Sequence, residues 1–242
     1  MTIPLHTLTW GSGPKRALLL HGVSSDAGGW WRVGPDVAAL GYTVKAPDLR
    51  GHGQTPPGDD YRLEAYRDDV LALGDAWDLV LGHSLGGAVA MLAQLARSVF
   101  AKRLILADPV VEVQDPDDAM EWLMEPFLDP ITEAAIGAAH PRWGAEDVRF
   151  KVAALEATSP EVLRRTIWEN HREFKESVDL LDVPTLIIGA DPAIETLVTP
   201  EMGEGFAARN PNVTFTWIEG AGHSMHREDY PAFWAAVTRF VS

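Results

Sequence analysis

Short apolar runs alternate with longer amphipathic segments along the first half of the chain. Each run is followed within two residues by glycine or proline, which is typical of buried strands that end in a turn. The runs are residues 17–20, 42–46, 79–81 and 104–107. Between them, apolar residues recur at helical spacing from Leu63 to Leu73, and residues 85–96 are rich in alanine and leucine. This order predicts a parallel sheet with helices on both faces.

The pattern changes after Asp108, where helical spacing replaces the short runs. From residue 111 to about residue 178 the chain shows helical segments and no convincing strand. Within this stretch, Ser159-Pro160-Glu161 predicts a helix start. A serine cap, a proline in the first turn and an acid near the positive end of the helix dipole all favour one.

Strand-like patterns return towards the end of the chain. Residues 184–189 form an apolar run, residues 213–218 alternate, and residues 230–241 have the spacing of a closing helix. The simplest organisation is therefore one sheet domain, formed by residues 1–110 and 181–242, with a helical insertion at residues 111–180.

The composition narrows the class of protein. The chain has 242 residues, of which 46% are hydrophobic, enough for one α/β domain with a sizeable core. Because there is no cysteine, a disulfide scaffold, a thiolate metal site and a cysteine nucleophile are excluded. A net charge of −15 argues against non-specific binding to nucleic acid or anionic membranes. No long apolar run or signal-peptide pattern is visible, so we expect a soluble, cytoplasmic protein.

The strongest chemical motif is Gly82-His83-Ser84-Leu85-Gly86, which fits G-x-S-x-G. An apolar run precedes it and an alanine-rich helical segment follows, as a nucleophile elbow requires. A sharp strand-to-helix turn exposes the serine hydroxyl above the sheet, and small neighbours allow that turn to form. The alternative is a turn in which glycine merely fits. We interpret Ser84 as the nucleophile.

Two further segments supply groups that such a serine needs. Gly220-Ala221-Gly222-His223 follows a predicted strand, and a histidine on a loop there can accept the serine proton. His21-Gly22-Val23-Ser24 follows the first buried strand. The backbone N–H groups of Val23 and Leu85 could together form an oxyanion hole.

With these motifs in order, the chain resembles the α/β-hydrolase superfamily. The segments at residues 48–53 and 184–189 match it as well. The resemblance implies a mostly parallel eight-stranded sheet and a cap formed by the helical insertion. It also implies a catalytic triad in the chain order nucleophile, acid, histidine.

The acid of that triad is open. The loop after residue 189 offers Asp191 and Glu195, but neither has the spacing usual in the family. A second arrangement in the superfamily corresponds to Asp108, after the strand that follows the elbow helix. Asp108 and Asp191 both follow predicted strands, where sites gather in open α/β sheets. We favour Asp108, with Asp191 as the alternative and Glu195 as the third candidate.

Aromatic residues are candidates for the substrate pocket. Trp122, Trp143 and Trp168 lie in the insertion, and Trp30 follows the predicted oxyanion loop, where Ser24 could add a hydroxyl contact. Alternatively, the tryptophans pack the cap onto the sheet.

The segment from residue 112 to residue 129 carries seven acids and no lysine or arginine. Such a field would repel anions, so we expect a small, largely apolar, neutral substrate. The acids are Glu112, Asp115, Asp117, Asp118, Glu121, Glu125 and Asp129.

The leading interpretation is a serine hydrolase of carboxylic esters or lactones that works through an acyl-enzyme, without metal or cofactor. One alternative is a hydrolase of a carbon–carbon bond in a ring-fission product. Another is a ligand receptor that keeps the fold but turns over poorly. The sequence leaves the physiological substrate and the oligomeric state, monomer or homodimer, open.

Overall fold

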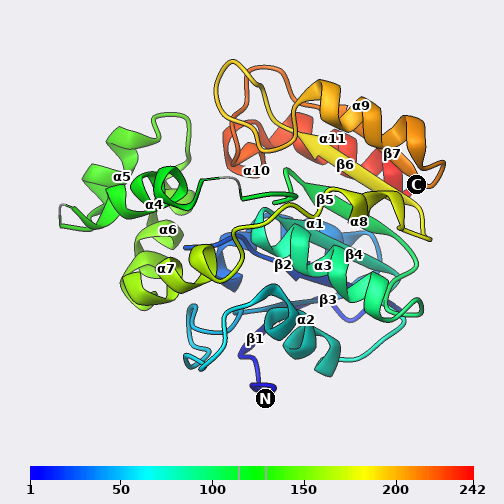
Figure 1. Ribbon diagram of the computed structural model, residues 1–242, viewed down its shortest axis with the longest axis horizontal. Helices are drawn as coiled ribbons and strands as arrows, with labels where there is room; N and C mark the ends of the chain where they lie inside the picture. Colours follow the sequence, from blue (N-terminus) through cyan, green and yellow to red (C-terminus); the bar gives the residue numbers. More distant parts are fainter. Residues whose placement is uncertain (114, 129) are drawn as a thin grey trace.

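A twisted sheet forms the centre of the molecule (Figure 1). The computed structural model describes residues 1–113, 115–128 and 130–242. The strands lie side by side in the order β1-β3-β2-β4-β5-β6-β7. β1 is antiparallel to β3, and every other neighbouring pair is parallel. The strands are β1 (Thr7–Trp10), β2 (Lys15–Leu20), β3 (Tyr42–Pro47), β4 (Leu79–His83), β5 (Leu104–Ala107), β6 (Thr185–Gly189) and β7 (Val213–Trp217).

The described residues form seven strands in this sheet, one fewer than the eight that the family resemblance implies. The difference lies at the N-terminal edge, where only β1 precedes β2. Backbone groups before β1 bond to side chains of the core instead. The N–H of Ile3 donates to Asp69 at 2.7 Å, and the N–H of His6 donates to Thr55 at 2.9 Å. These bonds use groups that a further edge strand would need for its ladder.

Helices cover both faces of the sheet. Successive side chains of a strand point to opposite faces. Leu18 and Leu20 therefore join one apolar cluster, and Ala17 and Leu19 join the other. The first cluster includes residues of α2 (Leu63–Ala72), α3 (Leu85–Ala96), α8 (Glu176–Asp179) and α9 (Pro200–Arg209). The second includes residues of η1 (Ala27–Trp30), α1 (Val33–Ala39), α10 (Met225–Glu228) and α11 (Tyr230–Val241).

Most of the insertion lies to one side of the sheet, as a separate group of helices (Figure 1). These are α4 (Pro116–Met124), η2 (Glu125–Phe127), α5 (Glu133–Ala139), α6 (Ala145–Ala157) and α7 (Pro160–Trp168). The group has a small apolar core of its own, built on Ile136, Val148 and Leu155. Ser159 caps α7, because its hydroxyl accepts a hydrogen bond from the N–H of Glu161 at 3.2 Å.

The segments that enter and leave this group run side by side, joined by an isolated antiparallel bridge between Glu112 and Glu173. α8 then packs against α3 and α9 of the sheet domain. None of the helices that the structure describes is both long and apolar enough to cross a membrane.

Candidate active site

Ser84 occupies the sharp turn between β4 and α3. Its backbone has φ of 53° and ψ of −118°, a conformation that residues other than glycine rarely adopt. Four backbone hydrogen bonds hold this strained residue. Its N–H donates to the carbonyl of Ala107 at 3.0 Å, and its own carbonyl accepts from the N–H groups of Gly87 at 3.0 Å and of Ala88 and Val110 at 3.2 Å. The surrounding backbone thus fixes the position of the serine hydroxyl.

The glycines around Ser84 are required because neighbouring backbone atoms lie too close to them to leave room for a Cβ atom. A Cβ atom at Gly86 would lie 2.2 Å from the carbonyl oxygen of Leu20. A Cβ atom at Gly82 would lie 2.3 Å from the carbonyl oxygen of Gly86. A side chain at Gly86 would therefore push the turn away from β2, and one at Gly82 would push the start of α3 away from β4; either change would displace Ser84.

His223 and Asp108 form a buried pair. Nδ1 of His223 lies 2.7 Å from Oδ2 of Asp108, which is fully buried at the end of β5. Oδ1 of Asp108 accepts from the hydroxyl of Thr196 at 2.8 Å and from the N–H of Val198 at 2.9 Å, and the N–H of Leu197 adds a further bond. With the proton on Nδ1 donated to Asp108, Nε2 of His223 is the nitrogen left to accept a proton.

Opposing effects act on the pKa of His223. Burial disfavours the charged imidazolium and would lower the pKa, but the hydrogen bond to Asp108 and its negative charge act in the opposite direction and prevail. The pKa of His223 therefore lies above the ordinary value of a histidine.

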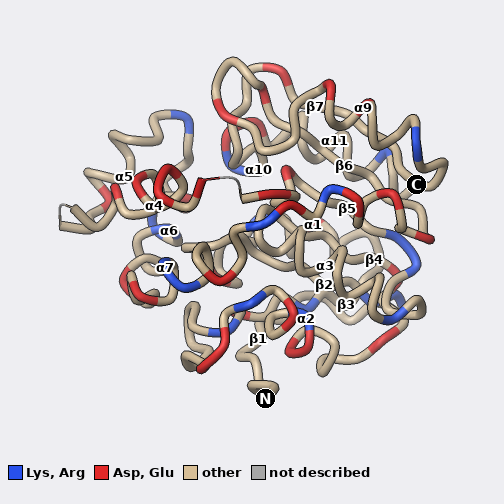
Figure 2. Tube along the Cα trace, in the orientation of Figure 1, with Lys and Arg blue, Asp and Glu red and all other residues tan. Residues whose placement is uncertain are grey.

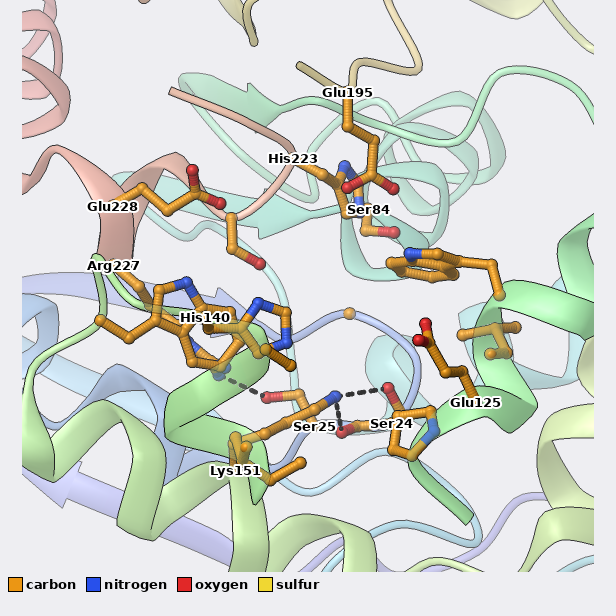
Figure 3. Close-up of a pocket in the computed structure, with 18 of the residues that line it drawn as sticks. Ser24, Ser25, Ser84, Glu125, His140, Lys151, Glu195, His223, Arg227 and Glu228 are labelled. Atoms are coloured by element: carbon orange, nitrogen blue, oxygen red, sulfur yellow. Dashed lines mark hydrogen bonds between the residues drawn. The ribbon is translucent and has the colours of Figure 1, made fainter. Parts of the chain in front are cut away.

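The other two candidate acids do not bond to His223. Asp191 accepts hydrogen bonds from the N–H of Gly220 at 2.7 Å and of Ala193 at 2.8 Å, and these bonds lower the pKa of its carboxyl. It thus shapes the loop that leads to His223. Glu195 lines the cavity beside His223 (Figure 3). Among the three, Asp108 is the carboxylate that the structure brings to Nδ1.

The two backbone groups expected for an oxyanion hole are available. Leu85 is the first residue of α3, so its N–H has no partner within the helix. The ring of His21 lies 2.8 Å from the carbonyl of Gly22 through Nδ1. Because a peptide unit is planar, the N–H of Val23 in the same unit points away from His21. Within the described part of the chain, neither the N–H of Val23 nor that of Leu85 donates a hydrogen bond.

A cavity of about 850 Å³ lies between the insertion and the sheet domain, and Ser84 and His223 both line it (Figure 3). Much of its wall is apolar, including Trp122, Ile136 and Trp143 from the insertion. Its size and mixed lining are those of a small-molecule site.

Some of the residues that the sequence suggested for substrate contact line the cavity in the structure, and others do not. Ser24, Trp122 and Trp143 line the cavity. Trp30 does not, since it is 1% exposed and packs in the apolar core under the sheet, 5.2 Å from the ring of His226. Trp168 is 41% exposed on the face of α7 opposite its buried residues, where it contacts His171.

Three residues of the site had no part in the sequence-based assignment. Nε2 of His83 lies 2.9 Å from the carbonyl oxygen of His223, and the centres of the two rings, tilted by 41°, lie 4.6 Å apart. His83 therefore fixes the backbone of His223, and its place inside the G-x-S-x-G motif was the available signal. Lys151 and Arg227 also line the cavity, but no motif marks them. The described residues contain no group of three or more side chains able to hold a metal ion.

Comparison with known proteins gives a family model, two sequence relatives and a solved structure. A family model described as "Alpha/beta hydrolase family" matches residues 17–237. An uncharacterized protein of Mycobacterium tuberculosis is 41% identical over 96% of this chain and 76% of its own length. Lipase LipV of the same species is 37% identical over 64% of this chain, and the match spans 62% of the lipase, less than two thirds of its length. Among solved structures, N-formylmaleamic acid deformylase from Pseudomonas putida has a TM-score of 0.81 at 24% identity, covering 97% of this chain and 96% of that one.

Proposed function

The chain belongs to the alpha/beta hydrolase family, and on this premise we propose that it is a serine hydrolase that cleaves a carboxylic ester or lactone. One observation carries the proposal. The carboxylate of Asp108 lies 2.7 Å from Nδ1 of His223, and His223 lines the same cavity as the strained Ser84. Nucleophile, base and orienting acid are the three parts that acyl transfer through a serine requires. The match to a lipase supports an ester as the bond that is cleaved.

The first half of the reaction forms an acyl-enzyme. The hydroxyl oxygen of Ser84 attacks the substrate carbonyl while Nε2 of His223 takes the proton. Negative charge develops on the carbonyl oxygen, and the N–H groups of Val23 and Leu85 donate to it. Collapse of this intermediate breaks the bond to the alcohol, which leaves with the proton from His223.

The second half of the reaction releases the carboxylic acid product. A water molecule takes the place of the alcohol and gives its proton to His223 as it attacks the acyl group. The hydroxyl of Ser84 is restored when the second tetrahedral intermediate collapses. Throughout, Asp108 keeps the imidazole in the required tautomer and stabilises its cation. Trp122, Ile136 and Trp143 offer an apolar surface to the hydrocarbon part of the substrate.

The pH dependence follows from the raised pKa of His223. Below that pKa the imidazole is protonated and cannot accept the proton of Ser84, so activity falls as the pH is lowered. For an ester without ionisable groups, we expect kcat/KM to reach half its plateau at a pH above about 6.5, the ordinary histidine value. An acidic limb centred well below that value would contradict the pairing of His223 with Asp108.

The test of the proposed function is labelling by a fluorophosphonate, which traps an activated serine. We expect one adduct per chain, located on Ser84 by peptide mass spectrometry, and parallel loss of 4-nitrophenyl ester hydrolysis. Saturating 4-nitrophenyl acetate should protect Ser84 from the label. Hydrolysis that persists after complete labelling, or an adduct on another serine, would overturn the proposal.

A further inference from the structure

Arg227 is a buried cation on which the carboxylates of Asp147 and Asp26 act only from a distance. It is 7% exposed, yet the described residues provide no ion pair for it, and its Nε atom has no hydrogen-bond partner. Its Nη2 donates to the hydroxyl of Ser25 at 3.2 Å, and its guanidinium lies 4.5 Å from the ring centre of Trp143. Arg50, the other buried arginine, contrasts with it, because Arg50 pairs with Asp69 at 2.7 Å. Buried charges are normally paired, so Arg227 leaves an interaction unmade.

Lys151 adds a second cation to the same wall of the cavity (Figure 3). It extends from α6, and its Nζ donates to the carbonyl of Ser24 at 2.9 Å and to the Ser24 hydroxyl at 2.7 Å. The part of the chain that the structure describes gives Lys151 no ion pair either. Burial and the positive charge of Arg227 lower the pKa of Lys151 to about 7, and the charge of Asp26 only partly offsets them.

The two serine hydroxyls complete a set of donors. The Ser24 hydroxyl accepts from Lys151, and the Ser25 hydroxyl accepts from Arg227. A hydroxyl that accepts through its oxygen retains its own proton to donate. Ammonium, guanidinium and two hydroxyl protons on one wall match the acceptor oxygens of a carboxylate.

The carboxylates of the cavity lie elsewhere. Glu195 lies beside His223, and Glu228 bonds to Arg142 and to the N–H of Gly222. Glu125 also lines the cavity and, like the other two among the described residues, forms no ion pair with Lys151 or Arg227. None of these three carboxylates pairs with the wall, and Asp26 and Asp147 act on it only through longer-range electrostatic attraction.

We propose that Lys151, Arg227, Ser24 and Ser25 form a subsite that binds a carboxylate group of the substrate. This inference rests on the proposed function: the preferred substrate is then an ester or lactone that carries a free carboxylate at one end and the scissile carbonyl at the other. In Figure 3 the four residues share one wall of the cavity, and Ser84 and His223 lie at another. A substrate that spans the two places its carbonyl at Ser84 while its carboxylate supplies the missing counter-charge.

This inference replaces the expectation of a neutral substrate, which rested on counting acids between residues 112 and 129. In the structure, Asp115 caps α4, and Asp117, Asp118 and Glu121 are exposed around it. Figure 2 shows these acidic positions crowded along α4. Exposed charges are screened by solvent and salt, whereas the cations lie in the cavity wall. Asp129, counted in the same segment, lies outside the described residues.

The test uses pairs of 4-nitrophenyl esters. The half esters of succinate, glutarate and adipate are compared with the neutral esters of butanoate, pentanoate and hexanoate. We expect at least one half ester to exceed its neutral partner in kcat/KM by about tenfold or more, as a charged hydrogen bond would give. Lys151→Met, which removes the charge and keeps the stem, should lower kcat/KM for that half ester about tenfold to a hundredfold, mainly through KM.

Hydrolysis of the neutral ester distinguishes a role of Lys151 in binding the substrate carboxylate from a purely structural role. Lys151 also holds the backbone of Ser24, so a merely structural role would reduce hydrolysis of both esters alike. We expect the neutral ester to change by no more than about threefold in Lys151→Met. Arg149→Gln is the matched control, since Arg149 is an exposed cation of the same helix that pairs with Glu146. It should alter neither ester. Arg227→Gln is measured in parallel, with circular dichroism as the check of its fold.

A binding measurement keeps this inference distinct from the proposed function. Calorimetric titration of Ser84→Ala with succinate, glutarate and adipate requires no turnover. We expect at least one of them to bind, and the binding to weaken about tenfold or more when Lys151→Met is added. If the protein cleaves no ester, the proposed function fails while this titration still decides the subsite. Absence of binding, equal losses for both esters, or wild-type preference for neutral esters would each overturn the subsite.

Discussion

Replacing Ser84 with alanine is expected to lower kcat for any ester substrate by about four to six orders of magnitude, as loss of the nucleophile does in other serine hydrolases. The reason is that Ser84 is the proposed nucleophile, held by neighbouring backbone at the turn between β4 and α3, and alanine has no hydroxyl to form the acyl-enzyme. Steady-state hydrolysis of 4-nitrophenyl esters measures the loss. Fluorophosphonate labelling should disappear with it.

The control for this variant is a second serine change outside the cavity. Ser98 is exposed at the end of α3, so Ser98→Ala should leave kcat within about twofold and stability nearly unchanged. Removing only a hydroxyl should also leave the unfolding midpoint of Ser84→Ala close to that of the wild type. A Ser84→Ala protein that still turns over at more than about one hundredth of the wild-type rate would contradict nucleophilic catalysis by this residue.

Replacing Asp108 with asparagine is expected to lower kcat by about four orders of magnitude with little change in overall fold. Oδ1 of Asp108 accepts from Thr196 and Val198, so the asparagine oxygen would keep that position. The amide nitrogen would then face Nδ1 of His223 and force its proton onto Nε2. An imidazole in this tautomer cannot accept the proton of Ser84.

Asp191→Asn is the matched variant for this experiment. Asp191 accepts the N–H groups of Gly220 and Ala193, and an asparagine oxygen can accept one of them. We expect its effect on kcat to stay within about tenfold, since it acts only through the shape of the loop before His223. Comparable losses in the two variants, or near-normal turnover of Asp108→Asn, would refute the assignment of Asp108 as the acid.

Periodicity predicted the sheet well because burial on both faces leaves a direct trace in the sequence. The run at residues 104–107 coincides with β5, and the alanine-rich segment coincides with α3. Shorter or half-exposed elements left no such trace. β1 is an edge strand of four residues, and α1 contains two residues poor at forming helices, Gly34 and Pro35. Neither was predicted.

The choice between Asp108 and Asp191 could not be made from the sequence, because both follow strands of the same sheet. What separates them is the path of the chain after β6. There, the N–H groups of Leu197 and Val198 turn back onto Asp108, whereas Asp191 faces the N–H of Gly220. Such contacts join residues about 90 positions apart and depend on the assembled fold.

Side-chain direction explains the tryptophans that were misplaced. Trp30 and Trp168 lie in the expected segments, but one points into the core and the other into solvent. Spacing along a helix cannot give its rotation about its own axis relative to a cavity. Lys151 and Arg227 were missed for a related reason, since only the folded chain shows that they line the cavity and that Nε of Arg227 has no hydrogen-bond partner.

The hydrogen bonds from Lys151 to Ser24 join α6 of the insertion to the loop that follows β2 in the sheet domain. Ser24 follows Val23, so α6 contacts the loop that carries one of the two N–H groups proposed for the oxyanion hole. Lys151 is therefore the residue at which the insertion, the loop after β2 and the proposed carboxylate subsite meet.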